Sequence, residues 1–267
     1  MPKKRNRYEK IIERIFLSHY ESGAEVVRFK RSEIAPAAKK LRIALPKNLG
    51  DVLYSFRFRS DFPVSVASSA PEGKNWMIRL MGKGEYAFVA NALTKITPRT
   101  DLVTTKIPDA TPGIIERYAL SDEQALLAKL RYNRLVDVFA GITCYPLQSH
   151  LRTSVADMGQ VETDEIYVGL DRKGAHYVIP VQAKGGRDQQ SVVQIEQDMA
   201  ICREKFPGLV CRPIAAQFMQ DDIIAMFEFE APRHEIAILA EKHYRLVPQE
   251  QLSPEELMTY QARVAST

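Results

Sequence analysis

Residues 160–184, QVETDEIYVGLDRKGAHYVIPVQAK, predict two strands joined by a tight turn. The first strand carries several carboxylates, and the second strand ends in Gln-Ala-Lys. In the turn, Asp171 stands at the first position and Gly174 at the fourth, which is typical of a three-residue hairpin loop closed by a left-handed glycine. That loop pairs Asp171 with Ala175 and thereby sets the register of the whole hairpin.

The register decides which polar side chains share a face of the hairpin. Side chains alternate along a strand, so Gln182 and Lys184 project from the same face. In the expected register, Asp164 lies opposite Gln182 and Glu162 lies opposite Lys184. A two-residue or four-residue loop would shift the register by one and bring Glu165 in place of Asp164. The turn glycine therefore favours Asp164.

Two carboxylates, an amide and an ammonium group on one strand face have two interpretations. Charges are costly to bury unless they pair or bind a metal, so the cluster could be a functional site. The residue types alone are equally typical of a solvated sheet face. The surrounding elements have to distinguish the two.

The elements around the hairpin follow a definite order. A capping-box pattern at 121–124, Ser-Asp-Glu-Gln, predicts the start of the helix that precedes the hairpin. Apolar residues at helical spacing predict the helix that follows it. The expected elements are a helix at 122–139, a short strand near 147–155, the hairpin, a helix at 189–206 and strands at 211–218 and 223–229.

This order, with an Asp on the second strand and Gln-x-Lys on the third, resembles the PD-(D/E)XK nuclease superfamily over roughly residues 115–235. The resemblance implies an α/β core with a mixed sheet flanked by helices. It also implies that Asp164 is the metal-binding aspartate, that Gln182 takes the Glu/Gln position of the motif, and that Lys184 is its lysine. Most members of the superfamily carry Asp or Glu where this chain has Gln182.

The implied chemistry is the hydrolysis of a phosphodiester bond, which needs a hard cation to neutralise phosphate charge and to lower the pKa of the attacking water. Mg²⁺ takes oxygen ligands. We therefore expect Asp164, the amide oxygen of Gln182 and the backbone carbonyl of Ala183 to bind Mg²⁺, with Lys184 beside the attacking water.

Replacement of an acid by Gln182 removes one negative charge from the expected metal site. Glu162 could recruit a second ion and supply the missing charge. Glu123, in the first turn of the preceding helix, could also supply it, although an acid at that position is equally a favourable partner of the helix dipole.

The charges of the chain are distributed unevenly. Residues 1–106 hold 21 Lys and Arg against 10 Asp and Glu, whereas residues 107–267 hold the other 16 and 23. A basic module beside an acidic one with a candidate metal site is typical of a protein that binds a polyanion with one part and cuts it with the other. A charge bias that serves only solubility is the alternative.

The basic half has an order of elements that suggests a winged helix. Ser32 is expected to cap the second helix of this half. Its hairpin turns at Gly-Lys-Gly, which places Lys83 at the tip where a wing could contact a phosphate backbone. The expected elements are a helix at 8–20, a strand at 26–29, helices at 32–42 and 48–57, and a hairpin at 75–90.

In a winged helix the third helix enters the major groove, led by its N-terminal residues. Lys47 and Asn48 at its start are therefore candidates for contact with base edges or phosphates. The other candidate contacts, at the far end of this helix, are Ser55, Arg57 and Arg59. The expected core-facing stripe of the helix is Leu49, Val52, Leu53 and Phe56.

Length and composition agree with an α+β protein of two domains. A chain of 267 residues with 45% hydrophobic content can build two modest cores. Three prolines and little helical periodicity predict a linker at 94–114. The expected parts are a winged-helix-like domain at 1–93, this linker, a nuclease domain at 115–235, and a C-terminal extension at 236–267 whose last helix starts at Pro254.

Several classes of protein are disfavoured by the sequence. The three cysteines have no metal-binding or disulfide-framework spacing, which favours a reducing, cytoplasmic location. No apolar run reaches transmembrane length, so no membrane association is expected. The chain also lacks a phosphate-binding Walker loop, so no nucleotide cofactor is expected.

We therefore expect a Mg²⁺-dependent, sequence-specific endonuclease for double-stranded DNA, similar to a type II restriction enzyme of a restriction–modification system. One site per chain implies a homodimer, because two sites related by a two-fold axis are needed to cut both strands at once. Two alternatives stay open: a structure-specific nuclease for repair or junction DNA, and a winged-helix regulator without catalytic activity.

Overall fold

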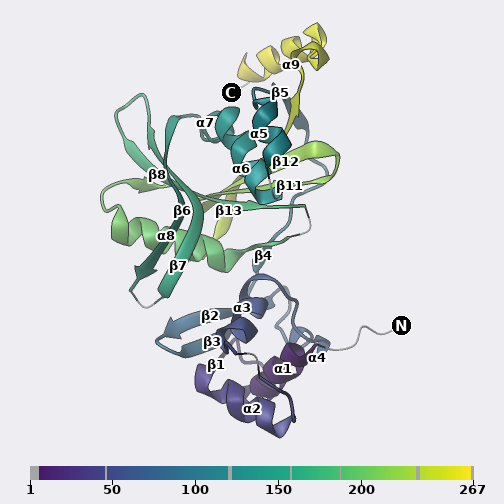
Figure 1. Ribbon diagram of the computed structural model, residues 1–267, viewed down its shortest axis with the longest axis vertical. Coiled ribbons are helices and arrows are strands. Elements are labelled where there is room, and N and C mark those ends of the chain that lie inside the picture. The colour runs from purple at the N-terminus through teal and green to yellow at the C-terminus, as the bar shows by residue number, and fades with distance from the viewer. Residues whose placement is uncertain are drawn as a thin grey trace. The chain divides into compact units, whose positions relative to one another are not determined.

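The computed structural model describes residues 6–45, 47–119, 122–156, 158–186, 188–232 and 235–265, and its secondary structure is mixed α+β (Figure 1). The chain divides into two compact units. The first unit comprises Met1–Ile96, Arg152–Thr163 and Gln189–Pro207. The second unit comprises Thr97–Leu151, Asp164–Asp188 and Gly208–Thr267.

The first unit contains a three-stranded antiparallel sheet in the order β1-β3-β2, together with its N-terminal helices. A two-stranded sheet of β4 and β9 joins two distant segments of the same unit. The elements are α1 (Arg7–His19), β1 (Val26–Lys30), η1 (Arg31–Glu33), α2 (Ile34–Lys40), α3 (Gly50–Phe58), α4 (Val64–Ala67), β2 (Asn75–Gly82), β3 (Glu85–Asn91), β4 (Lys95–Ile96), β9 (Gln190–Ser191) and α8 (Val192–Lys205).

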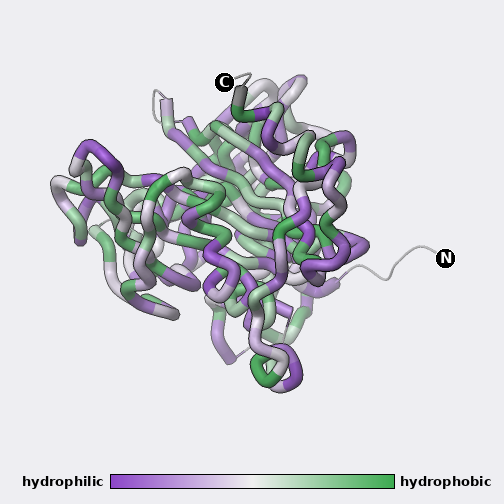
Figure 2. The backbone as a smooth tube through the Cα atoms, turned by 90° about the horizontal axis from the view of Figure 1, so that it is seen from above, coloured by the Kyte–Doolittle hydropathy of each residue, from purple (hydrophilic) through white to green (hydrophobic). Residues whose placement is uncertain are grey.

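Amphipathic patterning forms the core of the first unit. Helix α1 begins with a capping box between Asn6 and Glu9 and buries four apolar side chains along one face. Phe16 of α1 packs edge-on against Trp76 and Phe88, which come from β2 and β3. Hydrophobic and hydrophilic residues alternate along the backbone in Figure 2, as amphipathic helices and strands require.

The predicted elements of the basic half are confirmed with small shifts of their ends, with one difference at the second helix. The segment predicted as a helix at 32–42 is the 3₁₀ turn η1 followed by the short helix α2. The predicted cap at Ser32 is wrong: Ser32 lies inside η1, and the Glu33 carboxylate accepts the Lys30 backbone N–H at 2.7 Å instead. The expected buried stripe of α3 is confirmed for Val52, Leu53 and Phe56, with Leu49 packed against the core.

The second unit is built around a large mixed sheet in the order β5-β13-β12-β11-β8-β7-β6, with β10 paired to β8. Strands β6 and β7 begin in one unit and end in the other. The elements are β5 (Thr104–Pro108), α5 (Gly113–Tyr118), α6 (Asp122–Tyr132), α7 (Leu135–Ala140), β6 (Thr143–Val155), β7 (Gly159–Leu170), β8 (His176–Lys184), β10 (Val210–Cys211), β11 (Ile214–Phe218), η2 (Gln220–Asp222), β12 (Ile223–Glu230), β13 (Ala237–Val247), η4 (Gln249–Gln251) and α9 (Pro254–Ala265).

The register predicted for the hairpin is confirmed. Gly174 has φ +82°, and the Asp171 backbone N–H donates to the Ala175 carbonyl at 3.2 Å. The antiparallel pairs of β7 and β8 run from Leu170–His176 to Glu165–Val181, as the three-residue loop requires. The paired part of the hairpin therefore ends one residue before Asp164.

One predicted helix is broken in the structure. The segment 122–139 forms α6 and α7 instead of a single helix, because Arg134 adopts a left-handed φ of +50° between them. Asn133 fixes this break: its amide donates to Thr111 at 2.9 Å and its side-chain oxygen accepts the Ala110 N–H at 2.7 Å. The predicted cap at Ser121 lies outside the described residues.

The predicted linker and C-terminal extension differ from what the structure contains. The segment 94–114 supplies β4 and β5, and the segment 236–267 supplies β13 and α9. Strand β5 pairs in parallel with β13 at the edge of the large sheet, a position where Pro108 is tolerated at the strand end. Strand β4 therefore belongs to the first unit, whereas β5, β13 and α9 belong to the second unit.

Candidate functional site

Asp164 lies in the second unit, at the point where the pairing of β7 with β8 ends. Its Oδ2 accepts the backbone N–H of Ala183 at 2.8 Å. The Asp164 carboxylate thus accepts the N–H of a strand residue just beyond Glu165–Val181, the pair at this end of the β7–β8 ladder. This contact fixes the Asp164 carboxylate beside the segment that carries Gln182 and Lys184.

The surroundings of Asp164 disfavour its negative charge. Burial raises the pKa of the Asp164 carboxyl above its ordinary value, outweighing the Ala183 amide and the nearby Lys184, both of which lower it. The negative charge of Glu123 raises it further. Two carboxylates near each other in a largely buried place would both be stabilised by a cation between them.

Lys184 and Glu123 form the second contact of the site. Lys184 Nζ lies 3.1 Å from Glu123 Oε1, with the lysine side chain 15% exposed and the glutamate 42% exposed. Lys184 is the last residue of β8, and Glu123 lies in the first turn of α6. Three elements therefore contribute a charged group each: α6, β7 and β8.

A close approach between β8 and α6 holds this arrangement. A Cβ added at Gly185 would lie 2.9 Å from the Asp122 Cβ. Only a glycine at this position therefore lets the backbone after Lys184 lie so close to the start of α6. Sequence reasoning did not assign a role to Gly185. The Gly-Gly pair directly after Lys184 was the available signal.

The remaining motif residue, Gln182, is almost fully buried, with 1% of its surface exposed, and its position pairs with Ala215 of β11. Among the described residues, no group of three or more His, Cys, Asp and Glu side chains could hold a metal ion. The candidate oxygen ligands for a metal ion at this site are the Asp164 and Glu123 carboxylates, the Gln182 amide and the Ala183 carbonyl. This set suits a hard cation such as Mg²⁺.

The two other candidate acids of the hairpin have partners of their own. Glu165 is 2% exposed, forms an ion pair with Arg131 and accepts the Tyr167 hydroxyl at 2.6 Å. Glu162 belongs to the first unit, where its carboxylate accepts two hydrogen bonds from Arg152 at 2.8 and 3.2 Å. The site described here is therefore built without either of them.

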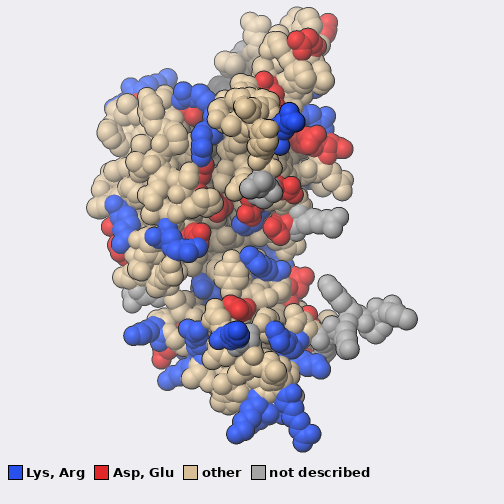
Figure 3. Space-filling view, viewed as in Figure 1, with Lys and Arg blue, Asp and Glu red and all other residues tan. Residues whose placement is uncertain are grey.

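The candidate DNA contacts all lie in the first unit, over whose surface Lys and Arg side chains are spread in Figure 3. Lys47 and Lys83 are exposed. Asn48 serves the start of α3: its Oδ1 accepts the Gly50 N–H at 3.0 Å, and its amide donates to Asp51 at 2.8 Å. Ser55 shares a hydrogen bond with the Ser60 hydroxyl at 2.8 Å.

The last two candidates, Arg57 and Arg59, stack on aromatic rings. Arg57 lies over Phe58 at 4.9 Å, and Arg59 lies over Tyr54 at 5.0 Å, both measured to the ring centroid. Burial lowers the pKa of the Arg57 guanidinium, which distinguishes it from an exposed surface arginine.

A scan against protein-family models and searches of curated proteins and of solved structures found no match to this chain. Within the described ranges, none of the helices has the length and apolarity needed to cross a membrane. The functional interpretation therefore rests on the geometry of the site.

Proposed function

We propose that this protein is a Mg²⁺-dependent DNA endonuclease that resembles the PD-(D/E)XK superfamily. The observation that supports this proposal is the convergence of Glu123, Asp164 and Lys184 from three elements, at the place where β7 leaves β8. Two carboxylates and an ammonium group in a partly buried site are suited to phosphodiester hydrolysis.

Each residue has a distinct role in this proposal. Asp164 and Glu123 would hold Mg²⁺ with the Gln182 amide oxygen and the Ala183 carbonyl. The bound ion would neutralise charge on the phosphate and lower the pKa of the attacking water. Lys184 donates hydrogen bonds from Nζ and would orient that water. The neutral Gln182 leaves the donor set with less negative charge, so we expect weak metal binding.

The first unit is the proposed reader of duplex DNA. Its order of helices and strands, with a β1-β3-β2 sheet, supports a winged-helix interpretation. In that interpretation α3 enters the major groove with Lys47 near its start, and Lys83 contacts the phosphate backbone from the hairpin tip. Cutting both strands at one recognition sequence calls for a homodimer.

Substitution of the site residues tests the nuclease proposal. Asp164→Asn and Lys184→Ala are each expected to reduce Mg²⁺-dependent cleavage of phage DNA by about 100-fold or more, because each removes a group that acts on the reacting atoms. Gel-shift binding of the same DNA is expected to persist. Asp101→Asn and Lys173→Ala are matched controls on exposed residues outside the site and should cleave like the wild type.

Cleavage that survives both site substitutions would contradict the assignment. Sequencing of the fragment ends separates the two nuclease interpretations: discrete ends indicate a sequence-specific enzyme, whereas cutting restricted to branched DNA indicates a structure-specific one.

A second candidate function is a DNA-binding regulator without catalytic activity. Gln182 in place of an acid favours it, as does the lack of a three-acid metal cluster within the described part of the chain. Wild-type protein that binds duplex DNA but cleaves none with Mg²⁺ or Mn²⁺ would support this function and contradict the nuclease.

A further inference from the structure

The first unit contains a cavity of about 390 Å³ at the end of α3. Its walls come from the end of α3 and the loop after it, the start of β2, and the paired strands β4 and β9. Aromatic rings of Phe58, Phe62 and Trp76 line it, and so do both Arg57 and Arg59. The cavity has the size of a small-molecule site.

Neither arginine has an ion-pair partner among the described residues. Apart from their cation–π contacts, the guanidinium groups of Arg57 and Arg59 make no hydrogen bond or ion pair with the residues that the structure describes. The Arg57 Nε is buried without a hydrogen-bond partner. A desolvated cation without a counter-charge is costly, so an anion in this cavity would be stabilised.

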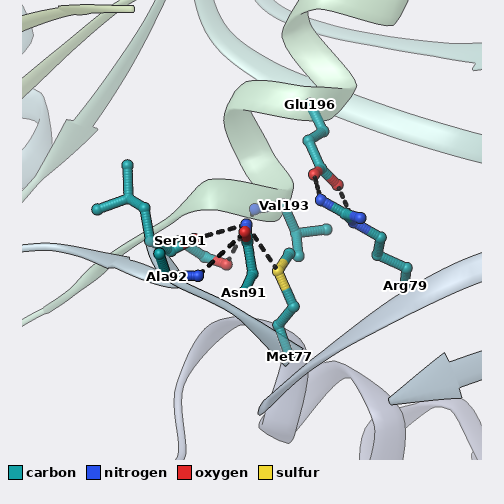
Figure 4. A network of polar contacts seen from close by, with 8 residues as sticks. Met77, Arg79, Asn91, Ala92, Ser191, Val193 and Glu196 are labelled. Carbon is teal, nitrogen blue, oxygen red and sulfur yellow. Dashed lines mark hydrogen bonds and ion pairs between the residues drawn. The ribbon is translucent and has the colours of Figure 1, made fainter. Parts of the chain in front are cut away.

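The acid that interacts electrostatically with Arg57 already forms an ion pair with another arginine. Glu196 of α8 is one of the groups that interact electrostatically with Arg57. However, Glu196 forms a two-pronged ion pair with Arg79, with Nε 3.1 Å from Oε2, as Figure 4 shows. Its charge is thus shared with a closer partner. An anionic ligand in the cavity would supply the ion-pair partner that Arg57 lacks among the described residues.

The backbone at the start of α8 is also engaged, so it cannot bind the anion. The Ser191 N–H donates to the Gln194 side chain, and the Val192 N–H donates to the Thr94 carbonyl. The Val193 N–H donates to the Ser191 hydroxyl (Figure 4). The cavity also contains Lys95, which forms an ion pair with Asp61. Of the three cationic side chains that line the cavity among the described residues, Arg57 and Arg59 are therefore the two that are left for an anion.

We infer that this cavity binds a phosphate monoester of nucleotide size, held by Arg57 and Arg59. Two guanidinium groups without an ion-pair partner among the described residues match the charge and the acceptor oxygens of a phosphate. Inorganic phosphate would leave most of the volume empty, whereas the aromatic lining suits the planar base of a nucleotide. The same group occurs on free 5′-nucleotides and on the 5′-phosphorylated end of a DNA strand.

The inference does not depend on the nuclease chemistry proposed above. The cavity residues all belong to the first unit, and Asp164 and Lys184 belong to the second. A protein with both site residues substituted should therefore bind the phosphate monoester as the wild type does, which separates a failure of one proposal from a failure of the other.

Isothermal titration calorimetry of the full-length protein tests the inference. The probes are the four deoxynucleoside 5′-monophosphates, the matching nucleosides, inorganic phosphate, and a hairpin oligonucleotide with either a 5′-phosphate or a 5′-hydroxyl. We expect the 5′-phosphate to improve affinity by about 10-fold or more over the matching nucleoside or 5′-hydroxyl. Preference for the free nucleotide or for the oligonucleotide identifies the source.

Arg57→Gln is expected to weaken binding of the best monophosphate by about 10- to 100-fold, because a charge-assisted bidentate contact is lost. Arg59→Gln, on an exposed residue that cannot disturb the core, is expected to weaken it by a smaller factor. The matched control is Arg117→Gln, which removes an arginine stacked on Tyr118 in the second unit and should change nothing. Thermal melting by circular dichroism verifies that each variant is folded.

Three outcomes would overturn the inference: no heat of binding with any 5′-monophosphate or 5′-phosphorylated oligonucleotide at millimolar concentration, equal affinity for nucleosides and monophosphates, or unchanged affinity in folded Arg57→Gln and Arg59→Gln variants.

Discussion

At the scale of single residues, the charge of Asp164 is expected to destabilise the folded protein, and the same carboxylate is the proposed Mg²⁺ ligand. Its carboxyl is largely buried, next to the charge of Glu123, so its pKa in the folded chain is raised above the ordinary value of 3.8. Ionised Asp164 is therefore expected to lower the stability of the folded protein in the absence of a cation, and this cost is expected to set in as pH rises above about 3.8.

Asp164→Asn is accordingly expected to raise the melting temperature at pH 7 in the presence of EDTA, because the amide keeps an oxygen for the Ala183 N–H without the buried charge. The gain should fade as pH falls and should vanish below about 3.8, where the carboxyl of the wild type is protonated in both the folded and the unfolded state. Differential scanning calorimetry across pH 3.5 to 8 measures it. A wild type more stable than the variant at pH 7 in EDTA would contradict the expected cost.

The same two proteins report on metal binding without any substrate. Mg²⁺ is expected to raise the melting temperature of the wild type, by about 2–4 °C for each kcal/mol of binding free energy. Asp164→Asn should show little or no rise. Equal responses of the two proteins to Mg²⁺ would place the ion elsewhere in the chain.

At the scale of secondary-structure elements, the contact of β8 with α6 sets the distance between Lys184 and Glu123. Gly185→Ala should destabilise the protein by about 1–3 kcal/mol, because its new Cβ would lie 2.9 Å from the Asp122 Cβ and force α6 away. Cleavage should fall with it, since Glu123 moves with the first turn of α6. Urea unfolding and cleavage rates measure the two effects.

The neighbouring glycine is a matched control for this substitution. A Cβ at Gly186 would meet nothing closer than the Phe218 carbonyl at 3.9 Å, so Gly186→Ala should be close to neutral in both measurements. Equal effects of the two alanines would show that the close approach to α6 does not control the site.

The elements also show which parts of the fold follow from local sequence. The register of the hairpin could be predicted because one turn, with Gly174 in a left-handed conformation, determines it. The break between α6 and α7 could not, since it depends on Asn133 contacting residues more than 20 positions earlier. Local sequence predicts a linker where β5 forms for the same reason: its partner, β13, lies about 140 residues further along the chain.

Some contacts of the candidate site also follow from local sequence, whereas others depend on tertiary packing. The contact of Asp164 with the Gln-x-Lys strand agrees with strand periodicity and turn chemistry, both of which are local. The pairing of Lys184 with Glu123 depends on how α6 packs on the sheet, which no periodicity encodes. The partnership of Glu162 with Arg152 in the first unit was likewise outside the reach of local rules.

At the scale of the whole molecule, the excess of Lys and Arg in residues 1–106 predicts that the proposed binding of DNA weakens as the salt concentration rises. Lys83→Ala, at the exposed tip of the β2–β3 hairpin, is expected to lower the slope of log affinity against log salt by about 0.9, the value for one phosphate contact. Fluorescence anisotropy with a labelled duplex at several salt concentrations measures the slope.

Lys173→Ala, at the tip of the β7–β8 hairpin, is the control and should leave the slope unchanged. An unchanged slope for Lys83→Ala would exclude the wing contact.

Segments that are far apart in the sequence build the first unit, so they leave the ribosome at different times during synthesis. The hydrophobic core of this unit lies between Ile11 and Ala90, so it can fold soon after these residues leave the ribosome. The wall of the arginine-lined cavity that contains Gln190 and Ser191 arrives about 100 residues later, roughly 5–20 s at ordinary rates of translation. A ligand of this cavity would therefore meet the complete cavity only in chains extended well past the first core, and we expect weaker binding to truncated chains whose N-terminal core is already folded.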